Sequence, residues 1–246
     1  MDRLVYVAMS GASETLRAQA ANNHNLANAS TTGFRADLSA FQSQAVEGTG
    51  LPSRVYATNG SVGWDDSTGE LQQTGNTLDV AISGAGWIAV QGSDGREAYT
   101  RAGDLRVDAA GQLRTGTGKP VLGDGGPIAV PPHASINVAR DGSVSIVPLG
   151  QTATTTATVG RIKLVNPPAG SLERGADGLF RLKSGSDAAA DAGVQLMSGV
   201  LESSNVNVAE TMTQMIELAR RFDLQVKAIH TAEEDAAASA RLLQAG

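Results

Sequence analysis

Apolar residues recur at alternating spacings of four and three near the start of the chain, which places them on one face of a helix. The row begins with apolar side chains and continues with mostly polar ones. Its members are Val5, Met9, Ala12, Leu16, Gln19, Asn23 and Leu26. The pattern predicts an amphipathic helix over residues 3–31 whose apolar face weakens toward its end.

A second row near the C-terminus is longer and keeps the same spacing without a break. Its members are Val208, Met212, Met215, Ala219, Phe222, Val226, Ile229, Glu233, Ala236, Ala240 and Leu243. This repeat is typical of a coiled-coil seam. Asn207 fits an N-cap with Glu210 three residues later, so we expect a helix that starts near Val208 and extends for about 55 Å. Met212 and Met215 also fit a promiscuous binding groove, but their place in the seam favours helix packing.

The middle of the chain shows a different pattern, in which short apolar segments alternate with glycine-containing turns. Among segments such as LDVAIS, WIAVQ and SINVARDGSVSIV, several have the two-residue period of strands. They predict an all-β outer domain over residues 77–199. Residues 36–76 are rich in Gly, Ser and Thr, so we expect an extended connector there and leave a hairpin open.

The predicted fold class is therefore α+β. Paired N- and C-terminal helices, coiled-coil-like and drawn from residues 1–35 and 200–246, form a discontinuous domain that flanks an all-β central domain. A helix of the length predicted at the C-terminus presents more surface than one small core can bury. We therefore expect the terminal segments to fold largely on assembly.

Composition and charge narrow the range of partners. The 246 residues carry a net charge of −6 without a cluster of Lys and Arg, so we expect no nucleic acid partner and no membrane insertion. The absence of cysteine excludes disulfides and thiolate metal sites. The apolar run after Arg3 is too short for a cleaved signal peptide, and no run approaches the length of a transmembrane helix.

The titratable residues show no spacing that indicates catalysis or a cofactor. His24, His133 and His230 are far apart in the sequence and lack a metal-ligand spacing, so we predict no metal site. Four aspartates lie in glycine-containing turns, where a carboxylate accepts hydrogen bonds from its own backbone. They are Asp94, Asp108, Asp141 and Asp177. We interpret them as turn residues rather than catalytic acids, and expect no enzyme activity and no cofactor.

Three longer segments resemble the signatures of the bacterial flagellar axial proteins, which are rod and hook components. They are NLANASTTGFRADL, TGNTLDVAISGAGWIAVQGSDGREAYTRAGDLRVDAAGQLRTGTGKPVLG and MSGVLESSNVNVAETMTQMIELARRF. Within that family, VGRIKLV, GLFRL and ARRFDLQVKAI resemble the proximal rod members, and residues 219–223 distinguish them from the distal rod paralogue. The distal rod paralogue is one alternative. A β-rich enzyme or carbohydrate-binding module with helical oligomerisation arms is the alternative from another class.

The resemblance implies a structural subunit of the flagellar basal-body rod. Such subunits polymerise helically through their terminal helices, as part of the drive shaft that transmits torque from motor to hook and filament. The implied partners are other rod subunits, copies of the chain itself and the flagellar type III export apparatus. The implied location is the basal body, where the rod crosses the periplasm after export without a cleaved signal peptide.

The two apolar rows and the resemblance together predict the residues at subunit contacts. They are Val5, Met9, Leu16, Asn23, Leu26, Asn28, Val208, Met212, Met215, Phe222, Val226, Ile229 and Leu243. Two residues are assigned to the turn at the end of the N-terminal helix. We expect Gly33 to be left-handed there and Phe34 to fold back on the last helical turn.

Several amides crowd the end of the N-terminal helix, although asparagine is a poor helix former. They are Asn22, Asn23, Asn25 and Asn28. We expect these amides to offer donors and acceptors to neighbouring subunits. The alternative is that they simply fray the helix end.

Overall fold

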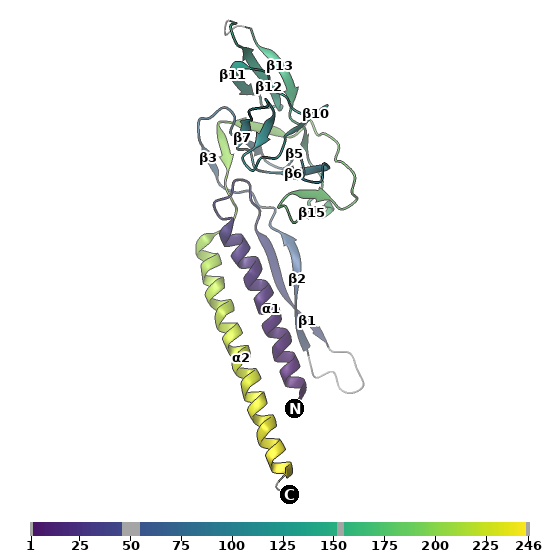
Figure 1. The fold of residues 1–246 in the computed structure, drawn as a ribbon, viewed down its shortest axis with the longest axis vertical. Coiled ribbons are helices and arrows are strands. Elements are labelled where there is room, and N and C mark those ends of the chain that lie inside the picture. Colours follow the sequence, from purple (N-terminus) through teal and green to yellow (C-terminus); the bar gives the residue numbers. More distant parts are fainter. Residues whose placement is uncertain (1, 46–54, 152–154, 245–246) are drawn as a thin grey trace. The chain divides into compact units, whose positions relative to one another are not determined.

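The chain forms two compact units, which are described separately (Figure 1). A computed structural model describes residues 2–45, 55–151 and 155–244. Unit 1 consists of Met1–Ala29, Ala36–Asp65 and Val206–Gly246, and unit 2 consists of Ser30–Arg35 and Asp66–Asn205. An N-terminal helix, a central β-rich region and a C-terminal helix confirm the predicted α+β class.

Unit 1 contains two long helices and a β-hairpin (Figure 1). Helices α1 (Asp2–Ala27) and α2 (Val208–Gln244) run antiparallel and pack against each other. Strands β1 (Asp37–Ala45) and β2 (Val55–Trp64) pair antiparallel and contact α1. The expected connector therefore contains the hairpin that the sequence left open, and this hairpin clusters with the helices.

The start of α2 follows from side-chain capping. Asn207 Oδ1 accepts hydrogen bonds from the backbone N–H groups of Ala209 at 3.1 Å and Glu210 at 3.3 Å. Two donors that the first helical turn leaves unpaired are thereby satisfied. The predicted start at Val208 is confirmed. The Glu210 side chain accepts a hydrogen bond from Gln214 Nε2, on the following turn.

Helix α1 ends earlier than predicted. Its last residue is Ala27, so the expected continuation to residue 31 is wrong. The Asn28 amide closes the final turn, because its Nδ2 and its backbone N–H both donate to the His24 carbonyl. Gly33 does have a left-handed φ of 66°, but it lies beyond the helix end and belongs with Phe34 to unit 2.

Unit 2 is built of short antiparallel strands, as predicted for the middle of the chain. The largest sheet has the order β14-β5-β6-β16-β15, a second has the order β11-β12-β13, and the other strands pair as β10-β9, β17-β4, β18-β3 and β7-β8. The first strands are β3 (Leu71–Gln73), β4 (Val80–Ser83), β5 (Trp87–Gln91), β6 (Glu97–Thr100), β7 (Leu105–Val107), β8 (Leu113–Thr115), β9 (Leu122–Gly123) and β10 (Gly126–Pro127). The later elements are β11 (His133–Val138), β12 (Ser143–Pro148), β13 (Ala157–Arg161), β14 (Leu164–Val165), the 3-10 helix η1 (Ala169–Ser171), β15 (Leu172–Arg174), β16 (Phe180–Leu182), β17 (Gln195–Ser198) and β18 (Val200–Glu202).

Unit 2 has a hydrophobic core of its own. Fully buried aliphatic side chains from several strands form one cluster that includes Val80, Ile88, Val90, Leu113 and Val144. Burying each such side chain contributes about 1.5–3 kcal/mol. This core holds the short strands together although many of them pair over only two or three residues.

Candidate subunit interface

One row of residues on α2 faces α1. The row repeats in steps of four and three and is at least partly buried throughout: Thr211, Met215, Leu218, Phe222, Gln225, Ile229, Ala232 and Ala236. The buried row on α1 consists of smaller side chains, namely Gly11, Thr15, Ala18 and Asn22. Small residues on α1 therefore receive larger residues from α2, which lets the two helices approach closely.

Buried polar contacts fix the register of this helix pair. Asn22 Nδ2 donates to the Thr211 carbonyl at 2.8 Å. The Thr15 hydroxyl lies 3.1 Å from Gln225 Oε1, and a Cβ on Gly11 would lie only 2.8 Å from Gln225 Nε2. A slip of one helix along the other would leave these buried groups unpaired, at a cost of about 1–3 kcal/mol each.

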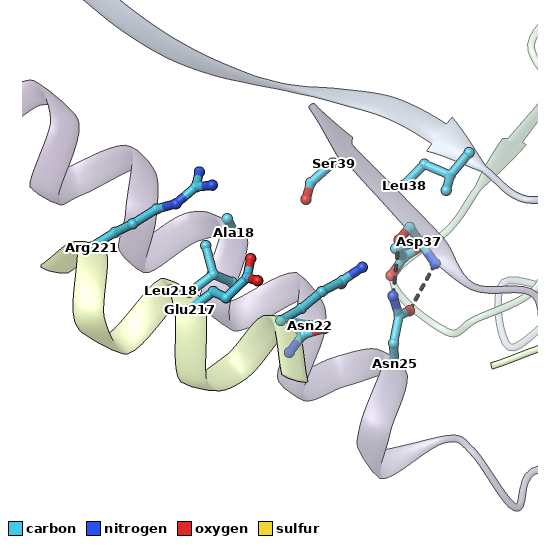
Figure 2. A pocket seen from close by; sticks show the side chains of 10 residues that line it. Ala18, Asn22, Asn25, Asp37, Leu38, Ser39, Glu217, Leu218 and Arg221 are labelled. Carbon is cyan, nitrogen blue, oxygen red and sulfur yellow. Dashed lines mark hydrogen bonds between the residues drawn. The ribbon is translucent and has the colours of Figure 1, made fainter. Parts of the chain in front are cut away.

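A polar cavity of about 250 Å³ opens beside the helix contact, where α1, α2 and β1 meet (Figure 2). Its lining residues are Ala18, Asn22, Asn25, Asp37, Leu38, Ser39, Gln214, Glu217, Leu218 and Arg221. The Asn25 side chain bonds the Asp37 backbone in both directions: Nδ2 donates to the Asp37 carbonyl at 2.9 Å and Oδ1 accepts from its N–H at 2.8 Å. His24 Nδ1 lies 2.6 Å from the Asp37 carboxylate, so the end of α1 is tied to the start of β1.

These contacts show what most of the crowded amides do. Asn22 bonds α2, Asn25 bonds β1 and Asn28 closes the end of α1. Asn23 is exposed, and within the described residues its side chain makes no hydrogen bond. Three members of the amide cluster therefore organise unit 1 itself.

The predicted contact residues fall into two groups on the structure. Met215, Phe222 and Ile229 lie on the α1-facing row and are partly buried. Five others are exposed apolar side chains: Met9 at 53%, Leu16 at 50%, Val208 at 42%, Met212 at 51% and Val226 at 45%. Val5, Leu26 and Asn28 are partly buried, and the side chain of Leu243 lies outside the described residues.

The split has a simple geometric cause. The sequence row and the α1-facing row share Met215, Phe222, Ile229 and Ala236, but they take their other members from adjacent positions. Sequence reasoning chose Met212 and Val226 because they are apolar, whereas the structure places Leu218, Gln225 and Ala232 against α1. The small residues Gly11, Thr15 and Ala18 repeat on α1 at the same spacing. This was the feature of the sequence that could have indicated which face of α1 packs closely against α2. Helix α2 thus carries an apolar row that α1 does not cover.

The turn aspartates make the backbone contacts expected of turn residues. Each carboxylate accepts from the backbone N–H two residues later, and the bonding pairs are Asp94 with Arg96, Asp108 with Ala110, Asp141 with Ser143 and Asp177 with Leu179. A hydrogen bond from the Arg181 side chain lowers the pKa of Asp177 to about 2. The pKa of Asp94 is also lowered, mainly by the Arg96 side chain. Both carboxylates are held ionised, which suits turn and ion-pair roles.

The histidines make separate local contacts. His133 Nδ1 lies 2.9 Å from the Pro131 carbonyl, and His230 lies 3.3 Å from Glu234 on the next turn of α2. Across the described residues, no group of three or more His, Cys, Asp or Glu side chains is placed to hold a metal ion. In the same part of the chain, no helix combines the length and the apolar character that crossing a membrane requires.

Two family models match this chain. One is described as the flagellar hook protein FlgE/F/G D1 domain and matches residues 81–146, within unit 2. The other is described as the flagellar basal body rod FlgEFG protein C-terminal region and matches residues 197–242, which include most of α2. The two matches cover part of the β-rich unit and most of the helix that carries the uncovered apolar row.

Full-length relatives resemble the chain from end to end. The flagellar basal-body rod protein FlgF of Escherichia coli strain K12 is 47% identical over 99% of this chain and 99% of its own length. That of Salmonella typhimurium is 45% identical over the same shares. The flagellar basal-body rod protein FlgG of Bacillus subtilis is 35% identical over 95% of this chain and 96% of its own length.

Proposed function

Because the chain belongs to the flagellar basal-body rod protein FlgF family, we propose that it is a structural subunit of the rod. It polymerises helically through α1 and α2, together with copies of itself and other rod subunits. The assembly forms part of the drive shaft that transmits torque from the motor to the hook and filament. The identity of 47% to FlgF of Escherichia coli, against 35% to FlgG of Bacillus subtilis, supports the proximal rod over the distal rod paralogue.

The uncovered apolar row of α2 is the observation that carries this proposal. Val208, Met212, Ala219 and Val226 follow one another at intervals of four, seven and seven residues, so they lie on one side of the helix. The three large side chains are each more than two-fifths exposed. Exposed apolar side chains repeated along one side of a helix are typical of a protein–protein contact.

Helix α1 offers a second apolar surface. Tyr6, Met9 and Leu16 are each at least half exposed and lie on the side of α1 that is turned away from the buried row. Unit 1 therefore has apolar surface on both helices after α1 and α2 have paired in a coiled-coil-like manner. A subunit with two such surfaces can contact neighbours on two sides, which is what a continuing helical assembly requires.

The terminal helices gain much of their stability in that assembly. An isolated helix pair with this much exposed apolar surface is marginal in water, because most helix stability comes from tertiary packing. We propose that the subunit leaves the cytoplasm through the flagellar type III apparatus without a cleaved signal peptide and assembles in the part of the rod that crosses the periplasm. No enzymatic role is assigned to it.

Two adjacent substitutions on α2 test the proposal. Met212→Asp introduces a charge into the uncovered row, whereas Thr213→Asp adds the same charge at the next position, outside the row. We expect Met212→Asp to abolish complementation of swimming in a strain that lacks this gene and to remove the chain from purified basal bodies. Thr213→Asp should retain both. Equal behaviour of the two variants, with both folded by circular dichroism, would contradict the proposed interface.

A further inference from the structure

Three segments of the chain leave unit 2, and all three meet at one buried carboxylate. The chain enters unit 2 after residue 29 and leaves it after residue 35, then enters it again after residue 65 and leaves it after residue 205. The three segments are residues 30–35, 66–70 and 202–205. Glu202 lies just before the last of these points, and its side chain is 1% exposed. It contacts both other segments, as its hydrogen bonds and ion pairs show.

Both the backbone carbonyl and the side-chain carboxylate of Glu202 contact the first segment, Ser30–Arg35. The Glu202 carbonyl accepts from the Gly33 N–H at 2.8 Å. Arg35 Nη2 lies 2.6 Å from Glu202 Oε1, at an angle that makes this an ion pair rather than an aligned hydrogen bond. Arg35 is fully buried, so this charge depends on Glu202 for its compensation.

The second segment is held by the same carboxylate. Glu202 Oε1 accepts from the Gly69 N–H at 3.0 Å. A Cβ on Gly69 would lie only 1.9 Å from the Ser203 carbonyl oxygen, so glycine allows the two segments to touch. The Ser203 N–H also donates to the Glu70 carbonyl at 2.9 Å, which continues the pairing of these segments.

A second arginine fastens the carboxylate to the core of unit 2. Arg101 Nη1 donates to Glu202 Oε2 at 3.2 Å, its Nη2 donates to the Gly84 carbonyl, and its guanidinium lies 5.4 Å from the centre of the Trp87 ring. Arg101 is 3% exposed, and burial lowers its pKa while the Glu202 charge opposes that shift. Removing the carboxylate would leave two buried cations facing each other.

Neighbouring side chains and backbone groups also connect these segments. The Phe34 ring lies 4.7 Å from the Arg174 guanidinium, which also donates to the Arg35 carbonyl. The Phe34 carbonyl accepts from the Asn205 N–H at 3.3 Å, and the Asn205 side chain donates to the Ser67 carbonyl at 3.0 Å. These contacts connect all three departing segments within unit 2.

We propose that Glu202, with Arg35 and Arg101, is a buried lock that makes the three departing segments of unit 2 open together or not at all. Its consequence for torque rests on the proposed function. In the rod, a force that reaches unit 2 through one of the three segments would be shared by all three, because Glu202 connects them. The lock itself is a property of the single chain.

Amide hydrogen exchange on the purified full-length chain tests the lock without requiring rod assembly. Glu202→Gln keeps the shape but removes the charge, so residues 30–35, 66–70 and 202–205 should all exchange about tenfold faster or more. The control is Glu97→Gln, because Glu97 is also a buried carboxylate in unit 2, 8% exposed and 2.7 Å from Lys163. It should leave those three segments protected. Loosening of only one segment in Glu202→Gln, or equal loosening in both variants, would overturn the proposal.

If Glu202→Gln does not fold, a milder variant tests the proposed lock. Arg35→Met removes one cation and leaves the Arg101 and Gly69 contacts of Glu202 in place. Because the lock couples the segments, residues 30–35, 66–70 and 202–205 should all exchange faster, though less than in Glu202→Gln. Faster exchange confined to residues 30–35, or unchanged exchange in all three segments, would overturn the lock. Swimming is measured separately, so a failure of the rod assignment would leave the exchange result intact.

Discussion

Gly33→Ala should destabilise unit 2 much more than a glycine substitution at an equally left-handed but open position. Gly33 has a φ of 66°, and a Cβ there would lie 2.3 Å from the Arg101 carbonyl carbon and 2.4 Å from the Ala102 nitrogen. Both atoms belong to the backbone and cannot swing aside. Gly95 has a φ of 78°, and nothing lies within 4 Å of its Cβ position. Gly95→Ala is therefore the matched control for the backbone conformation alone.

The two expected magnitudes follow from these surroundings. A left-handed conformation costs an L-residue about 1–2 kcal/mol, so Gly95→Ala should lower the free energy of unfolding by about that amount. Gly33→Ala adds displacement of Ser30–Arg35 and loss of the hydrogen bond to Glu202, which contributes about 1–3 kcal/mol more. We therefore expect a total loss of about 2–5 kcal/mol, from the sum of these two contributions, for Gly33→Ala.

Urea unfolding followed by tryptophan fluorescence measures this difference. Trp87 is 3% exposed in the core of unit 2, and Trp64→Phe in every protein removes the signal that comes from unit 1. The midpoint should fall further for Gly33→Ala than for Gly95→Ala, with unchanged slopes. Equal midpoints would show that the close approach of Gly33 to Arg101 and Ala102 does not matter in solution.

Three further predictions concern titration, assembly and helix packing. The pKa of Asp177 is lowered from 3.8 to about 2, so its ionised carboxylate stabilises the fold at pH values above 3.8, and this contribution is lost as the pH falls toward 2. Urea midpoints measured between pH 4 and pH 2 should therefore fall less steeply with pH in Asp177→Asn than in wild type. Amides of residues 2–29 and 208–244 should exchange quickly in the purified monomer and slowly in assembled rods, and uniform slow exchange in the monomer would contradict folding on assembly. Phe222→Ala should cost about 3–5 kcal/mol in the assembled rod if the ring is fully enclosed, as measured by rod dissociation in denaturant. Near-normal swimming of Phe222→Asp would count against the helix seam.

The hydrophobic pattern predicted the classes of the elements well because period and element type are directly related. The two-residue alternation in SVSIV became β12, and Asn207 marked the start of α2. The precise face of each helix was harder to predict. Apolarity alone selected Met212 and Val226, whereas Gln225 faces α1, where its amide oxygen lies near the Thr15 hydroxyl. Thr211 is buried there too, with its backbone carbonyl bonded to Asn22.

Contacts between distant segments could not be predicted from local pattern at all. Residues 30–35 read as the end of a helix, yet Gly33 and Arg35 are buried in unit 2, where they contact Glu202 and the Arg101 backbone, far along the chain. Likewise, the Asn25 amide appeared available to a neighbour until Asp37 was found to accept and donate to it. A single sequence shows that such polar residues are present but not which partner satisfies them.

A cryo-electron map of the intact basal body tests the central claim most directly. We predict that this chain lies in the rod, with Val208, Met212 and Val226 packed against helices of neighbouring subunits. Those side chains lie on the row that α1 leaves exposed. A map that lacks the chain, or one in which this row faces solvent and unit 2 makes all the subunit contacts, would contradict the account.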